Sequence, residues 1–297
     1  MGMSADTASP APGTTSIAGL LAAGRTRSLE FFPPRSDDAE RQFHEALAGL
    51  VDLGPSFASV TYGALGTTTD RTRELVVGMN AEHPFPTMAH LTCVGHTRAE
   101  IDALLDEYAR RGVHNILALG GDPPADGSPP GGEFTHAIEL VEVVRAHPGG
   151  FCIGVAAHPE LHPRSGDRTG DRRHLADKLR LADFAVTQFF FDVEHYRRLV
   201  QELADLGSDR PVVAGVMPFV SVAGVRRMAA MNRTDIPADL GRRLDLVADD
   251  PAAVAELGVE TATRLCAELA DAGAPGIHLY TLNRAASVRR MWDAIPV

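Results

Sequence analysis

Ser28-Leu29-Glu30-Phe31-Phe32-Pro33-Pro34 is the stretch that decides the fold, because it is a short apolar run that carries a carboxylate and is ended by two prolines. Seven similar runs follow along the chain, and each is about the length of one β-strand. Together the runs cover residues 28–32, 57–62, 87–92, 115–119, 151–157, 184–190, 212–217 and 276–281. Segments with helical spacing lie between them, at residues 37–52, 98–111, 136–146, 172–181 and 193–206.

This alternation of strand and helix predicts an α/β fold. Runs with Val, Ile, Phe and Ala on both faces are typical of parallel strands covered by helices, and eight such units are what a (β/α)₈ TIM barrel requires. We expect one barrel domain over residues 26–297, preceded by a tail at 1–25 that is largely disordered apart from a short helix at 17–23. Further helices are expected at 222–231, 238–247 and 251–272, before the last strand.

Polar residues stand at or just after the ends of these runs. In such barrels the chemistry takes place at the carboxyl ends of the strands and in the loops that follow. We therefore expect one end of the barrel, its mouth, to gather eight side chains: Glu30, Thr61, His90, Thr92, Asp122, His158, Gln188 and Tyr280. The alternative for each one is a strand-end cap or a filler of a barrel layer.

The composition limits the class of partner. The 297 residues carry a formal net charge of −11 and show no basic cluster, which argues against nucleic acid or an anionic membrane and favours small molecules. Cys93, Cys152 and Cys266 are too widely spaced for a disulfide framework or a structural zinc site, as is typical of a reducing cytoplasm. No apolar run reaches the roughly eighteen residues of a membrane span, and the start lacks the pattern of a signal peptide. A homo-oligomer is left open.

Three of the mouth residues suggest specific chemistry. Two phenylalanines follow Glu30, and they would desolvate its carboxyl and favour the protonated form, which can act as a general acid. A salt bridge to Arg27 or Arg35 is the alternative. Asp122 offers two acceptor oxygens to a planar ligand with adjacent N–H donors, and Gln188 offers one donor and one acceptor to the same kind of ring.

His158 and His162 stand four residues apart, a spacing that suggests a metal site on a helix. Pro159 and Pro163 make a regular helix unfavourable there, so no metal is predicted. An unrelated barrel lyase or metal-dependent transferase, with these histidines and Asp122 as ligands, stays as an alternative.

Seven motifs, in order along the chain, resemble the methylenetetrahydrofolate reductase family. They are Leu29-Glu30-Phe31-Phe32-Pro33-Pro34, Ser59-Val60-Thr61-Tyr62-Gly63-Ala64, His90-Leu91-Thr92-Cys93, Gly121-Asp122, His158-Pro159-Glu160-Leu161-His162-Pro163, Thr187-Gln188-Phe189-Phe190-Phe191-Asp192 and Tyr280-Thr281-Leu282-Asn283-Arg284. The resemblance runs from about Ser28 to Val297. It implies a barrel enzyme of one-carbon metabolism that reduces 5,10-methylenetetrahydrofolate to 5-methyltetrahydrofolate with NADH or NADPH, on the way to methionine.

The resemblance also implies roles for individual residues. Glu30 matches the acid that protonates the folate, so that its five-membered ring opens to an iminium. The positions implied to bind folate are Asp122, Gln188, Phe219, Tyr280 and Arg284. The positions implied to bind the nicotinamide nucleotide or the family's flavin, FAD, are Thr61, His90, Gly121, His158, His162, Asp171 and Lys178.

Several positions depart from the family's flavin site, so FAD is doubtful. Members commonly have an arginine where this chain has Gly120, and the chain also differs at Phe134, His158, His174 and Asp177. We hypothesise that FAD binding is weakened or lost and that the nicotinamide nucleotide reduces the folate directly. The alternatives are a conventional FAD-dependent reductase and a non-catalytic folate-binding barrel.

Overall fold

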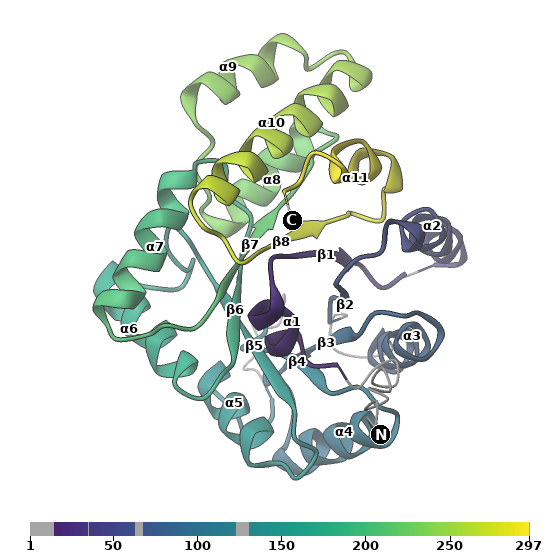
Figure 1. Cartoon of the computed structure of the whole chain (residues 1–297), viewed down its shortest axis with the longest axis vertical. Helices are drawn as coiled ribbons and strands as arrows, with labels where there is room; N and C mark the ends of the chain where they lie inside the picture. The colour runs from purple at the N-terminus through teal and green to yellow at the C-terminus, as the bar shows by residue number, and fades with distance from the viewer. Residues whose placement is uncertain (1–14, 35, 63–67, 123–130, 297) are drawn as a thin grey trace, which may run out of the picture.

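The structure, a computed structural model, describes residues 15–34, 36–62, 68–122 and 131–296. Eight parallel strands close into a barrel in chain order, with β1 paired to β8 (Figure 1). The strands are β1 Thr26–Phe31, β2 Phe57–Val60, β3 Thr87–Thr92, β4 Asn115–Leu119, β5 Cys152–Ala157, β6 Phe184–Thr187, β7 Val212–Val216 and β8 Gly276–Tyr280. The predicted (β/α)₈ barrel is confirmed.

Helices fill the intervals between the strands and follow the last one. They are α1 Ile17–Ala23, α2 Asp37–Ala48, a 3₁₀ turn Val51–Leu53, α3 Thr68–Glu82, α4 Arg98–Arg110, α5 Ala137–Ala146, α6 Arg168–Leu179, α7 Val193–Asp205, α8 Val222–Asn232, α9 Ala238–Leu246, α10 Pro251–Asp271 and α11 Ala285–Trp292. None of the helices in the described ranges combines the length and apolar character that a bilayer crossing requires.

Two helices or strands differ from the sequence prediction in a way that matters for the mouth. The strand expected over 184–190 ends at Thr187, where the side chain of Gln188 accepts a hydrogen bond from the N–H of Phe189. Helix α6 begins at Arg168 and not at residue 172, because the Asp167 carboxylate caps the free N–H of Gly170 at 2.8 Å. The longer helix brings Arg168 onto the same element as Arg172.

Helix α1 lies across the centre of the barrel at the amino-terminal ends of the strands, which we call the floor (Figure 1). Ile17 and Leu21 are buried in an apolar cluster inside the barrel; its other buried members are Phe57, Met88, Leu117, Cys152, Phe184, Val186 and Val213. The main chain of α1 is fixed as well, since the N–H of Ile17 donates to Asn115 Oδ1 at 2.9 Å. The helix expected at 17–23 thus fills the floor, whereas the tail before residue 15 lies outside the described residues.

The strand register sets which residues meet inside the barrel. Ser28 is level with His278, and Glu30 is level with both Ser59 and Tyr280. Side chains two residues apart on a strand point to the same side, so Ser28 and Glu30 share the inner side of β1, and His278 and Tyr280 share that of β8. Four polar side chains therefore face one another across the β1–β8 seam.

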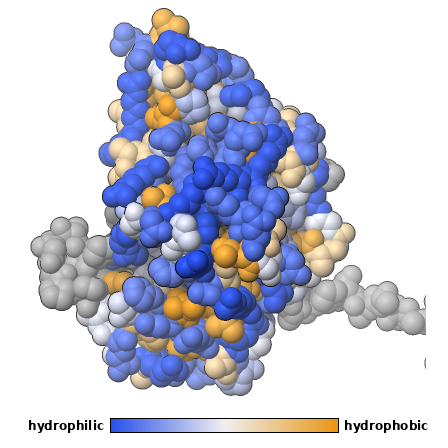
Figure 2. Space-filling view, turned by 90° about the vertical axis from the view of Figure 1, so that its left-hand side faces the viewer, coloured by the Kyte–Doolittle hydropathy of each residue, from blue (hydrophilic) through white to orange (hydrophobic). Residues whose placement is uncertain are grey.

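A second apolar cluster lies outside the barrel, near the ends of β6 and β7. It contains Phe189, Phe191, Met217, Phe219, Val225, Leu240, Leu244, Val254 and Leu257, and α8, α9 and α10 cover it. The surface in Figure 2 is mostly hydrophilic, with apolar residues in small groups.

Candidate functional site

Glu30, the next-to-last residue of β1, is the centre of a polar cluster at the mouth. Its side chain is almost fully enclosed, with 5% of the residue exposed. One carboxylate oxygen, Oε2, lies 3.3 Å from His278 Nε2 and 3.5 Å from both His90 Nε2 and Ser59 Oγ. A buried carboxyl among histidines and hydroxyls can exchange a proton with them, and the surrounding apolar strands keep water away.

His278 connects Glu30 to the layer below. The histidine is fully buried, and its Nδ1 lies 2.7 Å from Ser28 Oγ, which in turn donates to the carbonyl of Ile277 at 3.2 Å. Since that hydroxyl uses its hydrogen on the carbonyl, Nδ1 carries the proton that bonds Ser28. Nε2 then faces the carboxylate of Glu30 at 3.3 Å and the hydroxyl of Ser59 at 3.2 Å, so a proton on any of these groups can be shared with the others.

His90 flanks Glu30 from β3 and has a different protonation behaviour. Burial lowers the pKa of His90 to about 4. The charge of Glu30 acts in the opposite direction, and the charge of His278 adds to the lowering. The ring is therefore neutral at physiological pH. Its Nε2 is buried and makes no hydrogen bond within the part of the chain that the structure describes. A buried, unpaired ring nitrogen beside the acid is a natural contact for a ligand.

Tyr280 closes the same cluster from the end of β8. Its hydroxyl donates to the carbonyl of Thr187 at 2.6 Å, and burial, followed by the charge of Glu30, raises the pKa of Tyr280 well above its usual value. The ring reaches this place only because β7 carries Gly215 there: a Cβ at that position would come within 2.8 Å of the Tyr280 hydroxyl.

The loop after β8 fixes the main chain around Glu30. Thr281 Oγ1 donates to the Glu30 carbonyl at 2.7 Å. Asn283 bonds both main-chain groups of Phe32, accepting at 3.0 Å and donating at 2.9 Å. Leu282 and Asn283 adopt left-handed conformations, with φ of 51° and 54°, which are costly for residues other than glycine. In this strained conformation the loop forms hydrogen bonds to the main chain of both Glu30 and Phe32.

A second group of residues surrounds the β5–α6 loop. The rings of His158 and His162 meet edge to face, with centroids 4.6 Å apart. Burial lowers the pKa of His158 to about 3, with further lowering by His162 and Lys178. Burial also lowers the pKa of Lys178 to about 8, and its amine donates to the carbonyl of Ala156 at 3.2 Å. Asp171 accepts from the N–H of His162 at 3.3 Å.

Gly120 and Gly121 follow β4 and pack closely against their neighbours. Gly121 has a left-handed φ of 85°, and a Cβ there would lie 3.1 Å from Thr92 Cβ. A Cβ at Gly120 would lie 3.4 Å from the guanidinium of Arg164, which comes from the β5–α6 loop. The position where family members carry an arginine on β4 is therefore covered by an arginine from the neighbouring loop.

A sequence description of the methylenetetrahydrofolate reductase family matches residues 18–296. The chain belongs to this family. Methylenetetrahydrofolate reductase (NADH) 1 of Arabidopsis thaliana is 36% identical over 270 residues, which are 86% of this chain and 46% of the plant protein. The 5,10-methylenetetrahydrofolate reductase of Escherichia coli is 34% identical over 260 residues, 87% of this chain and 86% of the bacterial one. The chain thus spans about half the length of the plant relatives and most of the bacterial ones.

Solved structures agree on the fold. A protein from Clostridium thermocellum, described as binding two copies of 5-methyl-5,6,7,8-tetrahydrofolic acid, superposes with a TM-score of 0.60 at 12% identity, covering 93% of this chain and 96% of its own. A 2,3-dimethylmalate lyase superposes with a TM-score of 0.56 at 11% identity, covering 96% of this chain and 85% of its own. At such identities these likenesses support the barrel alone.

The other residues that the reductase family implies lie around the mouth with different exposures. Asp122 and Arg284 are exposed, whereas Thr61 and Gln188 are half-buried. Gln188 Nε2 donates to Asn232 Oδ1 at 3.5 Å, and its main-chain N–H donates to Ala157. Phe219 is not brought to an open surface. It is 1% exposed and packs against Phe191 in the cluster under α8 to α10.

At the flavin positions where this chain departs from the reductase family, the side chains are buried in the core, exposed, or paired with a neighbouring residue. Phe134 is buried in the core between strands and helices. His174 is exposed on α6, and Asp177 forms an ion pair with Arg180 at 3.2 Å on the same helix. The negative charge of Asp177 thus has a local partner on the helix surface.

Two sequence alternatives can be compared with the contacts. Arg27 stacks over Trp292 at 4.7 Å and donates to its carbonyl, so it does not pair with Glu30, and Arg35 lies outside the described residues. Within the described ranges no group of three or more His, Cys, Asp or Glu is placed to hold a metal ion.

Sequence reasoning missed several residues of the site: Ser28, Ser59, Arg164, His278 and Asn283. A signal for His278 was present, because it stands two residues before Tyr280 and so shares its side of the strand.

Proposed function

We propose that this chain reduces 5,10-methylenetetrahydrofolate to 5-methyltetrahydrofolate, with NADH or NADPH as the hydride donor and Glu30 as the acid. The observation that carries the proposal is the enclosed Glu30 carboxyl within reach of His278, His90 and Ser59 in a member of this family. A group that only held a pterin ring would not require a proton donor surrounded by proton acceptors.

The proton and hydride balance assigns a role to the cluster. Protonation of a folate nitrogen by Glu30 breaks the C–N bond of the five-membered ring and leaves an electrophilic methylene carbon. Transfer of a hydride to that carbon completes the methyl group, and the nicotinamide becomes oxidised. The transferred proton stays on the folate nitrogen, so Glu30 takes up one proton from solvent in each turnover, and His278, 3.3 Å away, is placed to share the proton of the acid before its transfer. Positioning of the two reactants in contact supplies much of the remaining acceleration.

Binding of the pterin is assigned to Asp122 and Gln188. A carboxylate accepts two N–H groups of the ring, and an amide pairs with one donor and one acceptor. Arg284 is exposed at the rim beside a surface pocket lined by Gln42, Glu45 and Asn283. Its guanidinium suits the carboxylates of the glutamate part of the folate.

The residues present fit the diphosphate of a dinucleotide. Arg164 beside Gly120 and the amine of Lys178 supply positive charge, and Nε2 of His90 offers a contact beside the acid. His158, His162, Thr61 and Asp171 complete the set. An FAD bound here would accept a hydride from the nicotinamide and pass it to the folate.

We infer that the hydride passes directly from the nicotinamide nucleotide to the folate. Supporting this are the outward, locally paired Asp177 and the exposed His174, at positions where the family carries flavin-binding groups. Direct transfer requires both substrates on the enzyme together. Intersecting lines in double-reciprocal plots are expected, and parallel lines would contradict direct transfer.

The test is the visible spectrum of protein expressed with ample riboflavin, together with NADH oxidation driven by methylenetetrahydrofolate. A colourless protein that oxidises NADH supports direct transfer, and a yellow active protein supports the flavin route. Glu30→Gln should lower kcat at least about 100-fold while keeping folate binding. Folate binding without any turnover in the unaltered chain would favour a binding protein.

A further inference from the structure

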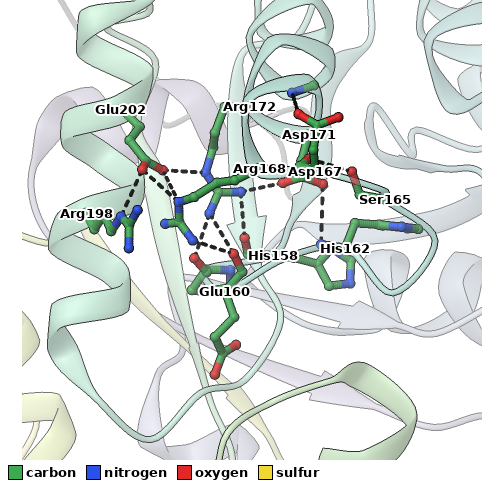
Figure 3. Close-up of polar contacts among 12 residues, drawn as sticks. His158, Glu160, His162, Ser165, Asp167, Arg168, Asp171, Arg172, Arg198 and Glu202 are labelled. Atoms are coloured by element: carbon green, nitrogen blue, oxygen red, sulfur yellow. Dashed lines mark hydrogen bonds and ion pairs between the residues drawn. The ribbon is translucent and has the colours of Figure 1, made fainter.

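Arg172 of α6 is a buried arginine with every direction of its guanidinium in use (Figure 3). Only 2% of the residue is exposed. Nε donates to Glu202 at 2.8 Å, one terminal nitrogen donates to the carbonyl of His158 at 3.0 Å, and the other donates to Pro159 at 2.7 Å and Glu160 at 3.1 Å. The guanidinium also contacts the carboxylate of Asp171.

Glu202 of α7 supplies the charge that a buried guanidinium needs. It accepts from Arg168 at 2.7 and 3.0 Å and from Arg198 at 3.0 Å, in addition to Arg172. Burial alone would raise the pKa of Glu202, but hydrogen bonds from Arg168, Arg172 and Arg198 outweigh it and lower the pKa to about 2. A buried charge is tolerated only when it is paired and hydrogen-bonded. Removing either Arg172 or Glu202 would therefore weaken the charge pairing of the other.

The three carbonyls that Arg172 holds are consecutive in the β5–α6 loop. Residues 158–160 belong to no strand or helix, so their carbonyls lack regular partners. Arg168 reinforces the hold by donating to the carbonyl of Glu160 at 2.8 Å. The other end of the loop is fixed through Asp171, which contacts Arg172 and accepts from the N–H of His162. One guanidinium thus determines, directly or through Asp171, where both histidines lie.

We propose that Arg172, fixed by Glu202, is the positioning residue that holds the His158–His162 loop in the shape that binds the dinucleotide diphosphate. The inference rests on the proposed function, because it assigns that ligand to the loop. Arg172 itself is turned away from the mouth into the α6–α7 side of the loop, and it acts only through the main chain of the loop and Asp171. Without it, three carbonyls lose their donors, and the loop can sample other conformations.

The primary test compares Arg172→Met with Arg198→Met. Both changes remove a guanidinium from Glu202, but Arg198 is largely exposed and touches no loop carbonyl. We expect Arg172→Met to raise the Kd for NADH at least about tenfold, which corresponds to roughly 1.4 kcal/mol, with folate Kd changed less than about twofold. Arg198→Met should leave both constants within about twofold. An unchanged NADH Kd in folded Arg172→Met would overturn the proposal.

A second readout separates positioning from general stability. In the unaltered chain the His158 ring packs against His162, and burial lowers its pKa to about 3, so we expect the ring to stay neutral down to low pH in NMR titrations. Loss of the Arg172 charge alone would raise the pKa of His158 only in part, because burial is the largest cause of its lowering. If the loop moves, Arg172→Met should expose the ring and bring its titration close to pH 6.5, while Arg198→Met should not. Failure of the unaltered chain to bind NADH would count against the proposed function alone, because the histidine titration still tests the loop. An unmoved titration would count against Arg172.

Two milder variants keep the test decisive if Arg172→Met fails to fold. Arg172→Lys retains the charge but loses the planar fork that reaches several carbonyls at once, so NADH binding should weaken in a folded protein. Glu202→Gln keeps the shape and removes the counter-charge. If both variants keep the NADH Kd and the His158 titration of the unaltered chain, the proposal is wrong.

Discussion

At the scale of single residues, Glu30 is distinguished by having two different histidines beside it. Burial keeps His90 neutral, since its pKa is lowered to about 4. His278 is oriented by Ser28 and presents Nε2 to the carboxyl at 3.3 Å. The two rings are therefore suited to different tasks: His90 to contact a ligand and His278 to share the proton.

His278→Gln is expected to lower kcat about 10- to 100-fold, because the side chain that shares the proton of Glu30 is lost. Binding of folate and NADH should change little, since His278 is fully buried below the mouth. Rapid-mixing measurement of turnover and equilibrium titration of each ligand check this. Ser59→Ala is the comparison, and a smaller loss is expected because its hydroxyl lies 3.5 Å from the carboxylate.

Glu160 carries a different kind of prediction, on stability against pH. Burial raises the pKa of Glu160 to about 7, and its carboxyl accepts from the N–H of Asp235 at 3.1 Å. Because the pKa of Glu160 is higher in the folded chain than in the unfolded one, its contribution to the free energy of unfolding is complete below pH 4.5. That contribution is lost as pH rises through about 7. Glu160→Gln should therefore gain in Tm relative to the unaltered chain between these values. Equal Tm differences at pH 5 and pH 8 would contradict this.

The sequence could predict Glu30, because a carboxylate in an apolar run is conspicuous. It could not as easily reveal His278 or Arg172. A histidine inside Gly276–Tyr280 resembles a core residue, and an arginine on a helix usually belongs to a solvated face. Both residues gain their roles only from partners distant in the sequence, namely Ser28 and Glu202.

At the scale of elements, the end of β4 and the β5–α6 loop lie against each other. A Cβ at Gly120, after β4, would lie 3.4 Å from the guanidinium of Arg164, so the β5–α6 loop brings a positive charge to the end of β4. The sequence around Gly120 predicts the loss of a positive charge there. It does not reveal that Arg164, more than forty residues later, lies beside Gly120 in the folded chain. The first residue of α6 was also not predicted from helical periodicity. It is set by the turn in which the Asp167 carboxylate accepts from the N–H of Gly170.

An exchange of the two residues tests this arrangement. Gly120→Arg alone starts a second arginine side chain against the Arg164 guanidinium, which must move, and we expect the NADH Kd to rise about tenfold because the two like charges repel. Arg164→Gly alone should raise it by a similar factor through loss of the charge. The double variant restores one guanidinium at the same place, and its Kd should return to within about threefold of the unaltered chain. Additive losses in a double-mutant cycle would show that Arg164 does not serve the ligand.

At the scale of the whole molecule, helix α1 closes the floor of the barrel. The alternation of strands and helices made the closed barrel predictable from the sequence, because eight parallel units have few other arrangements. The filling of the floor by α1 rests on contacts across more than ninety residues, such as Ile17 with Asn115. Periodicity within α1 could indicate a helix but not its target.

Ile17→Ala tests the structural role of this helix. The change removes a fully buried side chain from the floor cluster and should cost about 2 to 5 kcal/mol of stability. Thermal or urea unfolding measures the loss, and Ala22→Ser on the exposed side of α1 is the matched control. Below the transition, kcat should stay within about twofold, since the floor is far along the strands from Glu30. A selective loss of kcat would show that the floor affects the acid.

A filled floor has a consequence for hydrogen isotopes. Beneath Glu30 and His278 the barrel is occupied by aromatic and aliphatic side chains and closed by α1, so the acidic hydrogen reaches bulk solvent through the mouth. If folate binds at the mouth as proposed, it lies on that route. Deuterium from heavy water would then enter the acid between turnovers and not during them, so the solvent isotope effect on the first turnover after rapid mixing would depend on the solvent in which the free enzyme last equilibrated.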